Sequence, residues 1–325
     1  MSAFVLAFLM SIAFCWLYLS HARRKRWLDS PNERSSHTSA TPHGGGLGIF
    51  AAFGLGLTLY AVQAPVFDAQ LIPLVLATFV LVLIGWIDDL KALSVAVRFS
   101  LYGLLSIAVA AWILTGAEPW QEIWLLPCAV LFLLWLLNLY NFMDGIDGLA
   151  ATQCFLACAC AALLVFVNTG AGSYAAVCLL LAVTHLGFLF FNWPPARLFM
   201  GDAGSVPTGF LLGALALYGQ VHGLLPLASW LILLAAFITD ASWTLLGRLF
   251  TGQPVTQPHR LHLYQRLSRY WGSHVSVDML LLALNAFWLF PLAWAVTIWP
   301  QHQFILVIFA YIPLLLSMAK YRHLT

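Results

Sequence analysis

Long apolar runs separated by short polar segments make up most of the chain. A helix needs about 20 such residues to cross the hydrocarbon core of a bilayer, and no alternating pattern of the membrane β-barrel kind is present. We therefore predict an all-α polytopic membrane protein of about eleven transmembrane helices, a single domain over residues 1–325. The helices are predicted near 2–20, 45–63, 71–87, 97–115, 123–140, 149–168, 174–191, 206–220, 225–246, 276–298 and 304–319.

Composition agrees with this pattern. Hydrophobic residues make up 62% of the chain and charged residues 8%, whereas charged residues are about a quarter of an ordinary soluble domain. The net charge of +2 is too small to suggest nucleic acid as a partner. The six cysteines all fall in predicted spans without paired metal-ligand spacing, which indicates reduced apolar fillers.

The positions of the positive charges predict the orientation of the chain in the membrane. Arg23–Arg26 follow the first apolar run, whereas a cleaved signal would carry them in front, so this run is expected to remain as a span. All 14 Lys and Arg fall on or near one predicted side, which favours an N-out, C-in topology with an odd number of spans. The predicted cytoplasmic loops lie near 21–44, 88–96, 141–148, 192–205 and 247–275.

A polar stretch, Asn138–Ala150, follows the fifth predicted span at the membrane edge. Its polar residues recur every three positions, at Asn138, Asn141, Asp144 and Asp147. On a helix this spacing forms one slowly rotating stripe. Two amides and two acids at a membrane edge favour a bound hard cation. The alternative is a helix end with capping and turn residues.

Other acids are predicted on the same membrane face. Asp88 and Asp89 end the third span, near Lys91 and Arg98 in sequence, and Asp240 ends the ninth. The Asp pair either holds a phosphate through metal or Lys, or takes a proton from it; the alternative is a solvated pair that stops the helix. Several carboxylates facing many cations indicate a site for phosphate chemistry.

Residues 192–205 predict a tight loop after the seventh span. Pro194 and Pro195 stop that span. Gly201 and Gly204 bracket Asp202, freeing backbone N–H groups for an anion or leaving the carboxylate open to Mg²⁺. Phe199 is expected to be an exposed aromatic suited to stacking on a base. The alternative is a turn and N-cap for the next span.

Two further loops carry weaker signals. Three glycines, Gly44–Gly46, open the second span and could offer N–H groups to phosphate, or serve as a hinge. In the last large loop, His259, His262, Arg266 and Arg269 recur at three and four, which predicts one basic helical face. Such a helix either rests on anionic lipid headgroups or closes over an anionic substrate, and both roles are compatible.

Taken in this order, the motifs resemble those of the polyprenyl-phosphate N-acetylhexosamine-1-phosphate transferase family of membrane enzymes. The resemblance covers roughly residues 27–270. Four pieces carry it: Asp88-Asp89, Asn138–Ala150, Asn192–Ser205 with its Phe-Met-Gly-Asp, and Asp240 to His262. It implies transfer of a sugar phosphate from a UDP-N-acetylhexosamine to undecaprenyl phosphate with release of UMP. The implied location is the bacterial inner membrane with the site facing the cytoplasm, and a homodimer is left open.

The resemblance also implies roles for individual residues. Mg²⁺, with Mn²⁺ as an alternative, would be held by Asp202 and Asp144. The expected catalytic residues are Asp88, Asp89, Asp144, Asp147 and His262, with the Asp pair handling the prenyl phosphate. The expected substrate-binding residues are Lys91, Arg98, Asn138, Asn141, Asn192, Phe199, His259 and Arg260, with Phe199 stacking on uracil.

The chain departs from the family in the last loop, where a His-x-His-His cluster is usual. With His262 as the first histidine, Tyr264 and Gln265 occupy the other two positions. This difference indicates another donor sugar and resembles the branch that initiates O-antigen synthesis. An ion-coupled transporter is the main alternative, although transporters usually keep ionisable groups near mid-membrane and often contain repeats. An intramembrane aspartyl protease, suggested by Gly201-Asp202, lacks its usual partner motif.

Overall fold

The computed structural model describes residues 1–29, 40–115, 123–253 and 259–321. Within them the chain is almost entirely helical, with one short antiparallel ribbon of β1 (Leu28–Asp29) and β2 (Thr41–Pro42). The helices are α1 (Ser2–Lys25), α2 (Gly46–Gln63), α3 (Ile72–Leu90), α4 (Val95–Thr115), α5 (Leu126–Met143), α6 (Leu149–Asn168), α7 (Gly172–Asn192), α8 (Asp202–Val221), α9 (Leu227–Leu233), α10 (Ala235–Phe250), α11 (Leu263–Trp271), α12 (His274–Leu284), α13 (Phe290–Ile298) and α14 (Gln303–Lys320).

The prediction of an all-α polytopic membrane protein is confirmed. In the described part of the chain, nine helices are long and apolar enough to cross a membrane, and a tenth span results if α9 and α10 count as one. Each of the eleven predicted segments has a counterpart. The segment predicted near 206–220 corresponds to α8, which is not among these ten spans. The 20 residues of α8 include Gly, Ser and Thr at many positions.

Helix α8 forms the centre of the bundle. It packs against α3 and α5, and α2, α4 and α9 also contact it; nearly all its residues are buried. Its small residues allow close packing: a Cβ on Gly46 of α2 would lie 2.2 Å from the backbone N of Gly204. A helix surrounded by protein does not need an apolar surface for lipid, which explains its more polar composition.

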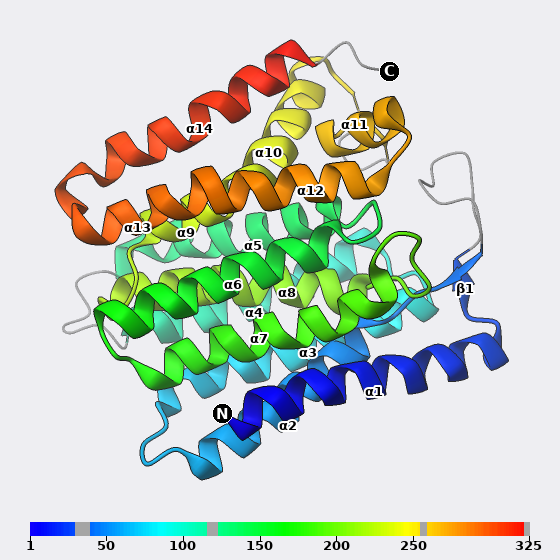
Figure 1. The fold of residues 1–325 in the computed structure, drawn as a ribbon, viewed down its shortest axis with the longest axis horizontal. Coiled ribbons are helices and arrows are strands. Elements are labelled where there is room, and N and C mark those ends of the chain that lie inside the picture. The colour runs from blue at the N-terminus through cyan, green and yellow to red at the C-terminus, as the bar shows by residue number, and fades with distance from the viewer. Residues whose placement is uncertain (30–39, 116–122, 254–258, 322–325) are drawn as a thin grey trace.

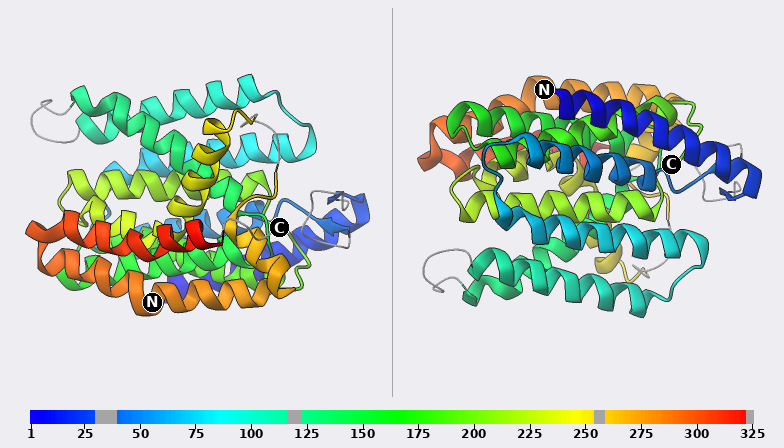
Figure 2. Two further views of the ribbon diagram at one scale, coloured as in Figure 1. Left: turned by 90° about the horizontal axis from the view of Figure 1, so that it is seen from above. Right: turned by 90° about the horizontal axis from the view of Figure 1, so that it is seen from below.

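Figure 1 shows most helices running along a common direction, with α12 and α14 on one side of the bundle and α1 and α2 on the other. Loops and short elements, including α11 and the β1–β2 ribbon, gather at the end where α1, α3, α5 and α7 finish. Figure 2 shows α10 standing at a steep angle to its neighbours. The predicted site residues belong to this end of the bundle.

The structure corrects the ninth span. We expected one helix over 225–246, but it breaks at Leu234, and α9 and α10 are bent by 74°. The bend carries Asp240 and the following segment over the end of the bundle. Because a broken helix leaves backbone groups without helical partners, such breaks occur where protein surrounds them, and Leu233, Leu234 and Ala235 are buried.

The last loop also differs from expectation. Helix α11 begins at Leu263, and His262 is its N-cap. His259 and His262 therefore precede the helix instead of sharing a helical face with Arg266 and Arg269. The six cysteines are free as expected, although Cys128 is exposed. Part of the predicted loop 21–44 and the residues Glu118, Glu122 and Arg322 lie outside the described residues.

Candidate active site

A cavity of about 810 Å³ opens at the loop-rich end of the bundle. Residues from α4, α5, α8 and α10 and from the segment before and within α11 line it. Its polar lining consists of Arg98, Tyr102, Asn138, Asn141, Asp144, Asp202, His259, His262, Tyr264 and Gln265. Residues separated by more than 160 positions in sequence thus face one space, as the predicted topology requires.

Asp202 connects four helices in this cavity. Asn141 Nδ2 donates to Asp202 Oδ1 at 2.7 Å and to Ser205 Oγ at 2.9 Å. Arg98 Nη1 lies 2.7 Å from Asp88 Oδ2 and 3.5 Å from Asp202 Oδ2. The end of α3, the start of α4, the end of α5 and the start of α8 therefore meet at one carboxylate, and Asp88 holds the arginine that faces it.

Burial and mutual repulsion disfavour the charged carboxylates. Burial, followed by the charge of Asp89, raises the pKa of Asp202 from its ordinary value of 3.8 to about 7. Burial also raises the pKa of Asp144, with further contributions from Asp202 and Asp89. A nearby cation stabilises the ionised form of such buried carboxyl groups. Strongly shifted groups in a cavity are typical of functional sites.

Asp89 lies near the end of α3, as predicted. Its carboxylate accepts the backbone N–H groups of Asp202 at 2.9 Å and Ala203 at 3.1 Å, which are the first two residues of α8. It thus caps the helix from a neighbouring helix, and the positive end of the α8 dipole favours its charge. A Cβ on Gly201 would lie 2.6 Å from Asp89 Oδ2, and Gly201 has φ +71°. Only glycine suits this close approach and conformation.

Asp240 caps α11 in the same way. Its oxygens accept the N–H groups of Leu263 and Tyr264, both at 2.9 Å, which begin the helix. His262 Nδ1 lies 3.2 Å from Asp240 Oδ1, and the His259 ring stacks on that of His262 with centroids 4.9 Å apart. The bend that places Asp240 here therefore determines where both cavity histidines lie.

Asp147 and Asn192 join the loops behind the cavity. Asp147 Oδ2 accepts from the Ala196 N–H at 3.0 Å and lies 3.3 Å from His274 Nδ1. Asn192 Oδ1 accepts from Gly148 N, and its Nδ2 donates to Leu198 O. Neither residue lines the cavity. Helix α5 ends at Met143, so the predicted stripe on one helix holds only for Asn138 and Asn141, and Asp144 and Asp147 lie in the loop.

The remaining predicted residues lie around this centre. Lys91 is exposed at the end of α3, Arg260 is half-buried, and neither lines the cavity. Phe199 is half-buried instead of exposed, and its backbone N–H donates to Pro42 O. Gly45 and Gly46 donate their N–H groups to Phe199 O and Met200 O. The N–H groups of Gly45 and Gly46 therefore stabilise the loop before Asp202 and are not directed at a phosphate.

Part of the cavity lining was not predicted from the sequence. Tyr102 lies four residues after Arg98 on α4, and its hydroxyl is buried. The same four-residue spacing could have predicted that it shares a face with Arg98. An apolar wall of Phe99, Leu131, Leu134, Trp135 and Leu245 also borders the polar cavity. Leu131, Leu134 and Trp135 precede Asn138 by seven, four and three positions, so they lie on the same side of α5.

The donor set suits a magnesium ion that shares its coordination with substrate. Within the described residues, no three His, Cys, Asp or Glu side chains lie close enough to hold a metal by themselves. Mg²⁺ is usually bound by one or two carboxylates, with water and substrate phosphates completing its octahedron. Asp144 and Asp202 in one cavity fit this requirement.

Carboxylates, an arginine and histidines line a cavity with an apolar wall in a polytopic membrane protein, an arrangement suited to phosphate chemistry. Residues 71–220 match the family described as "Glycosyl transferase family 4". Within residues 71–220 the chain has the sequence of this family, and its enzyme class is that of a phospho-sugar transferase. The expected family and enzyme class are confirmed.

Curated relatives match over most of the chain. It is 28% identical over 262 residues to the "Probable undecaprenyl-phosphate N-acetylglucosaminyl 1-phosphate transferase" of Bacillus subtilis, covering 76% of this chain and 71% of that protein. The chain is 29% identical over 281 residues to the "Undecaprenyl-phosphate alpha-N-acetylglucosaminyl 1-phosphate transferase" of Yersinia pestis, covering 81% of this chain and 75% of that protein. A "Phospho-N-acetylmuramoyl-pentapeptide-transferase" of Bacillus mycoides is 28% identical over 235 residues, covering 65% and 72%.

Proposed function

We propose that the protein transfers an N-acetylhexosamine 1-phosphate from a UDP-sugar to undecaprenyl phosphate, releasing UMP and forming a lipid-diphosphate-sugar. The observation that carries this proposal is the position of Asp202, between Arg98 and Asn141, in a cavity with an apolar wall. The names of the Bacillus subtilis and Yersinia pestis relatives support the substrates. The reaction would take place at the cytoplasmic face of a bacterial inner membrane.

Charge explains why these residues would be needed. The two substrates bring together roughly four negative charges, given a second phosphate pKa near 6. A divalent cation held by Asp202 and Asp144 would supply positive charge where the phosphates meet. Arg98 and His262, which line the same cavity, would add to this positive charge. Asp88 would keep the Arg98 guanidinium in place, at 2.7 Å.

The apolar wall suits the lipid acceptor. A polyprenyl phosphate stays in the bilayer, so only its phosphate and the first units of its chain can enter the site. Phe99, Leu131 and Trp135 continue the cavity away from Asp202 along α4 and α5, the two helices that also carry Arg98 and Asn141. A chain lying against this wall would present its phosphate to the Arg98–Asp202 pair. Asp88, which holds Arg98, is the candidate to receive the acceptor's proton.

The donor would occupy the side of the cavity formed by the last loop. His259, His262, Tyr264 and Gln265 line this side, and Tyr264 donates to Phe142 O at 2.9 Å. Tyr264 and Gln265 stand where the family usually has histidines, so this side is where the donor sugar would be selected. We propose a donor of the N-acetylhexosamine class, including its deoxygenated members, for the first step of O-antigen or related envelope glycan synthesis.

The test is incubation of the purified protein in detergent with undecaprenyl phosphate and a panel of UDP-N-acetylhexosamines, scoring UMP release. We expect release with at least one donor, dependence on the lipid, and loss on chelation of divalent cations. Release restored by Mg²⁺ or Mn²⁺ would identify the metal. An ion-coupled transporter would release no UMP with any donor, and that result would reject the proposal.

A further inference from the structure

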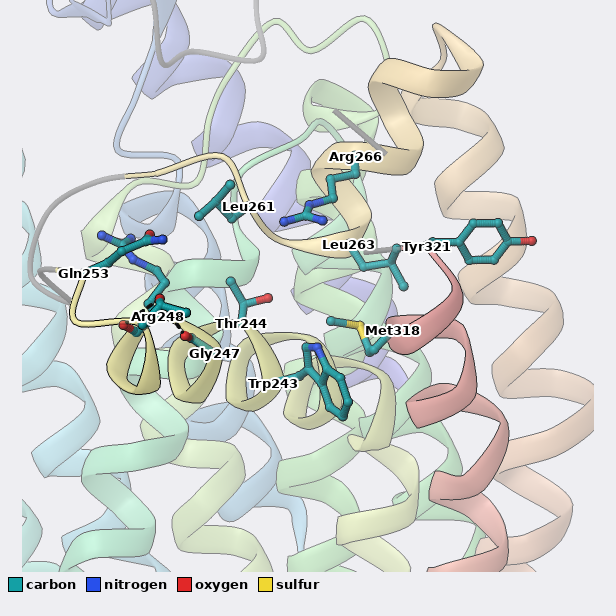
Figure 3. A pocket seen from close by; sticks show the side chains of 11 residues that line it. Trp243, Thr244, Gly247, Arg248, Gln253, Leu261, Leu263, Arg266, Met318 and Tyr321 are labelled. Atoms are coloured by element: carbon teal, nitrogen blue, oxygen red, sulfur yellow. Dashed lines mark hydrogen bonds between the residues drawn. The ribbon is translucent and has the colours of Figure 1, made fainter. Parts of the chain in front are cut away.

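A second pocket lies on the other side of the segment that carries His262. It has a volume of about 190 Å³ and is formed by the end of α10, the start of α11 and the end of α14. Figure 3 shows Arg248 and Gln253 at one side of it, Arg266 above, and Trp243, Met318 and Tyr321 at the other side. Two cationic side chains from different helices therefore border one hollow.

This pocket continues into an apolar slot. The slot has a volume of about 350 Å³ and lies between α10, α11, α12 and α14. Leu263, Met318 and Tyr321 line both spaces, so the two adjoin, and together they are called the groove. The slot is bordered mainly by apolar residues of the membrane-spanning helices, among them Phe237, Leu280, Leu284 and Leu314. The groove thus has a cationic end at the bundle surface and an apolar end at membrane depth.

The cationic end is suited to a phosphate. Arg248 is only 6% exposed although it lies in the last turn of α10, and a guanidinium can donate to a phosphate through two N–H groups at once. Thr244, Thr251 and Gln253 add hydrogen-bonding groups. Among the described lining residues of this pocket there is no Asp or Glu. Asp240 borders the slot, but its oxygens accept from Leu263 N and Tyr264 N.

We propose that this groove binds one anionic phospholipid of the bilayer, with its headgroup phosphate between Arg248 and Arg266 and an acyl chain in the slot. Charge complementarity at one end and apolar lining at the other both match such a lipid. Trp243 and Tyr321 also line the pocket, and these residue types are enriched at the headgroup level of membranes.

The acceptor lipid does not fit the same groove. The segment of His262 lies between the pocket and the cavity that contains Asp202. Leu261 and Leu263 line the pocket, His262 and Gln265 line the cavity, and Tyr264 lines both the slot and the cavity. A phosphate between Arg248 and Arg266 would therefore lie behind His262, away from Asp202. A lipid bound here would instead support α11, whose residues Tyr264 and Gln265 line the active cavity.

Native mass spectrometry of the full-length protein in detergent tests the proposal. Phosphatidylglycerol and phosphatidylcholine of equal chain length would be titrated separately. We expect one phosphatidylglycerol to bind in preference to phosphatidylcholine. Arg248→Gln and, independently, Arg266→Gln should each weaken phosphatidylglycerol binding by roughly tenfold, because each removes a charge-assisted hydrogen bond. Arg269→Gln is the matched control: the residue is exposed on α11 and does not line the groove, so binding should be unchanged.

Three results would overturn the proposal. Equal binding of the two phospholipids would show that no anion is recognised. Displacement of the lipid by millimolar inorganic phosphate would show a site for a soluble anion. Preferential binding of undecaprenyl phosphate, lost in both arginine variants, would assign the groove to the acceptor. Because the readout is lipid binding and not UMP release, the result does not depend on the proposed transfer reaction.

Discussion

At the scale of residues, the acidic candidates separate into two groups, apart from Asp88, which pairs with Arg98 and accepts the Leu93 N–H. Asp144 and Asp202 face the cavity, whereas Asp89, Asp147 and Asp240 bind backbone N–H groups of neighbouring segments. Both groups are aspartates near helix ends, beside glycine or in polar loops. Sequence could therefore predict that they gather at one end of the bundle. It could not distinguish them, since a capping contact between separate helices depends on tertiary packing that local spacing does not encode.

Two substitutions distinguish these groups. Asp202→Asn should reduce UMP release to less than about a tenth of wild type, because a neutral amide no longer attracts a divalent cation. In EDTA at pH 5, where the buried Asp202 carboxyl is mostly protonated and uncharged, the melting temperature of this variant should stay close to that of wild type. Asp89→Asn should lower both activity and melting temperature, because loss of a charged cap costs about 1 kcal/mol.

Differential scanning fluorimetry and UMP release, measured on the same preparations, check this pair. Asp202→Asn with more than a tenth of wild-type activity would remove Asp202 from the metal site. Asp89→Asn with an unchanged melting temperature would show that its contact with α8 does not stabilise the fold.

Asp202 also predicts a pH dependence of stability. Its folded pKa is raised from 3.8 to about 7, so the folded state binds the proton more tightly than the unfolded chain. This stabilisation is complete below about pH 4 and is lost as the pH rises through about 7. Without divalent cations, wild type should therefore become less stable relative to Asp202→Asn over this interval.

Adding Mg²⁺ should reverse the trend, because the cation competes with the proton for the same carboxylate. Melting temperatures from pH 5 to pH 8, with EDTA or with Mg²⁺, check the prediction in wild type and Asp202→Asn. The stabilisation by Mg²⁺ should be larger at pH 8 than at pH 5 and should depend on Asp202. An equal effect at both pH values would contradict it.

At the scale of elements, apolar length predicted the helices well, because a span must satisfy its own backbone hydrogen bonds in lipid. Two features could not be predicted in this way. Helix α8 lies inside the bundle, so its residues are suited to contacts with other helices and not to contacts with lipid. The break at Leu234 occurs in an uninterrupted apolar run without Pro or Gly, and the bend brings Asp240 to the start of α11.

The contact between Asp240 and the start of α11 leads to a prediction. Asp240→Asn should weaken the attachment of the helix, because an amide can accept through only one oxygen where two N–H groups now donate. We expect a loss of about 1–2 kcal/mol in stability and a larger rise in KM for the UDP-sugar than for the lipid, since Tyr264 and Gln265 would move.

Thr244→Ala provides the control. The Thr244 hydroxyl donates to Asp240 Oδ1 at 3.3 Å, so its removal leaves both backbone contacts of Asp240 intact. Kinetics with each substrate varied in turn, together with thermal unfolding, check the prediction. Equal effects of the two substitutions on the KM for the UDP-sugar would mean that the Asp240 cap does not position α11.

At the scale of the whole molecule, the distribution of charge predicts which end of the bundle faces the cytoplasm. Helices α1, α10 and α14 each carry Lys or Arg in their last turn, and these turns belong to the end that contains the cavity. UDP-sugars are cytoplasmic, so the proposed reaction requires the same orientation. The two ends of α3 offer a direct test, because Val66 precedes this helix and Ala92 follows it, and both are exposed.

In a background in which the six native cysteines are replaced, Val66→Cys and Ala92→Cys would be introduced separately. A membrane-impermeant maleimide applied to intact spheroplasts should label Val66→Cys and leave Ala92→Cys unlabelled. After the membrane is permeabilised, both should react, which controls for accessibility. Because Ala92 lies three residues after Asp89 and six before Arg98, labelling of Ala92→Cys in sealed spheroplasts would place the cavity outside the cell. The cavity would then have no access to cytoplasmic UDP-sugars, and the proposed function would fail.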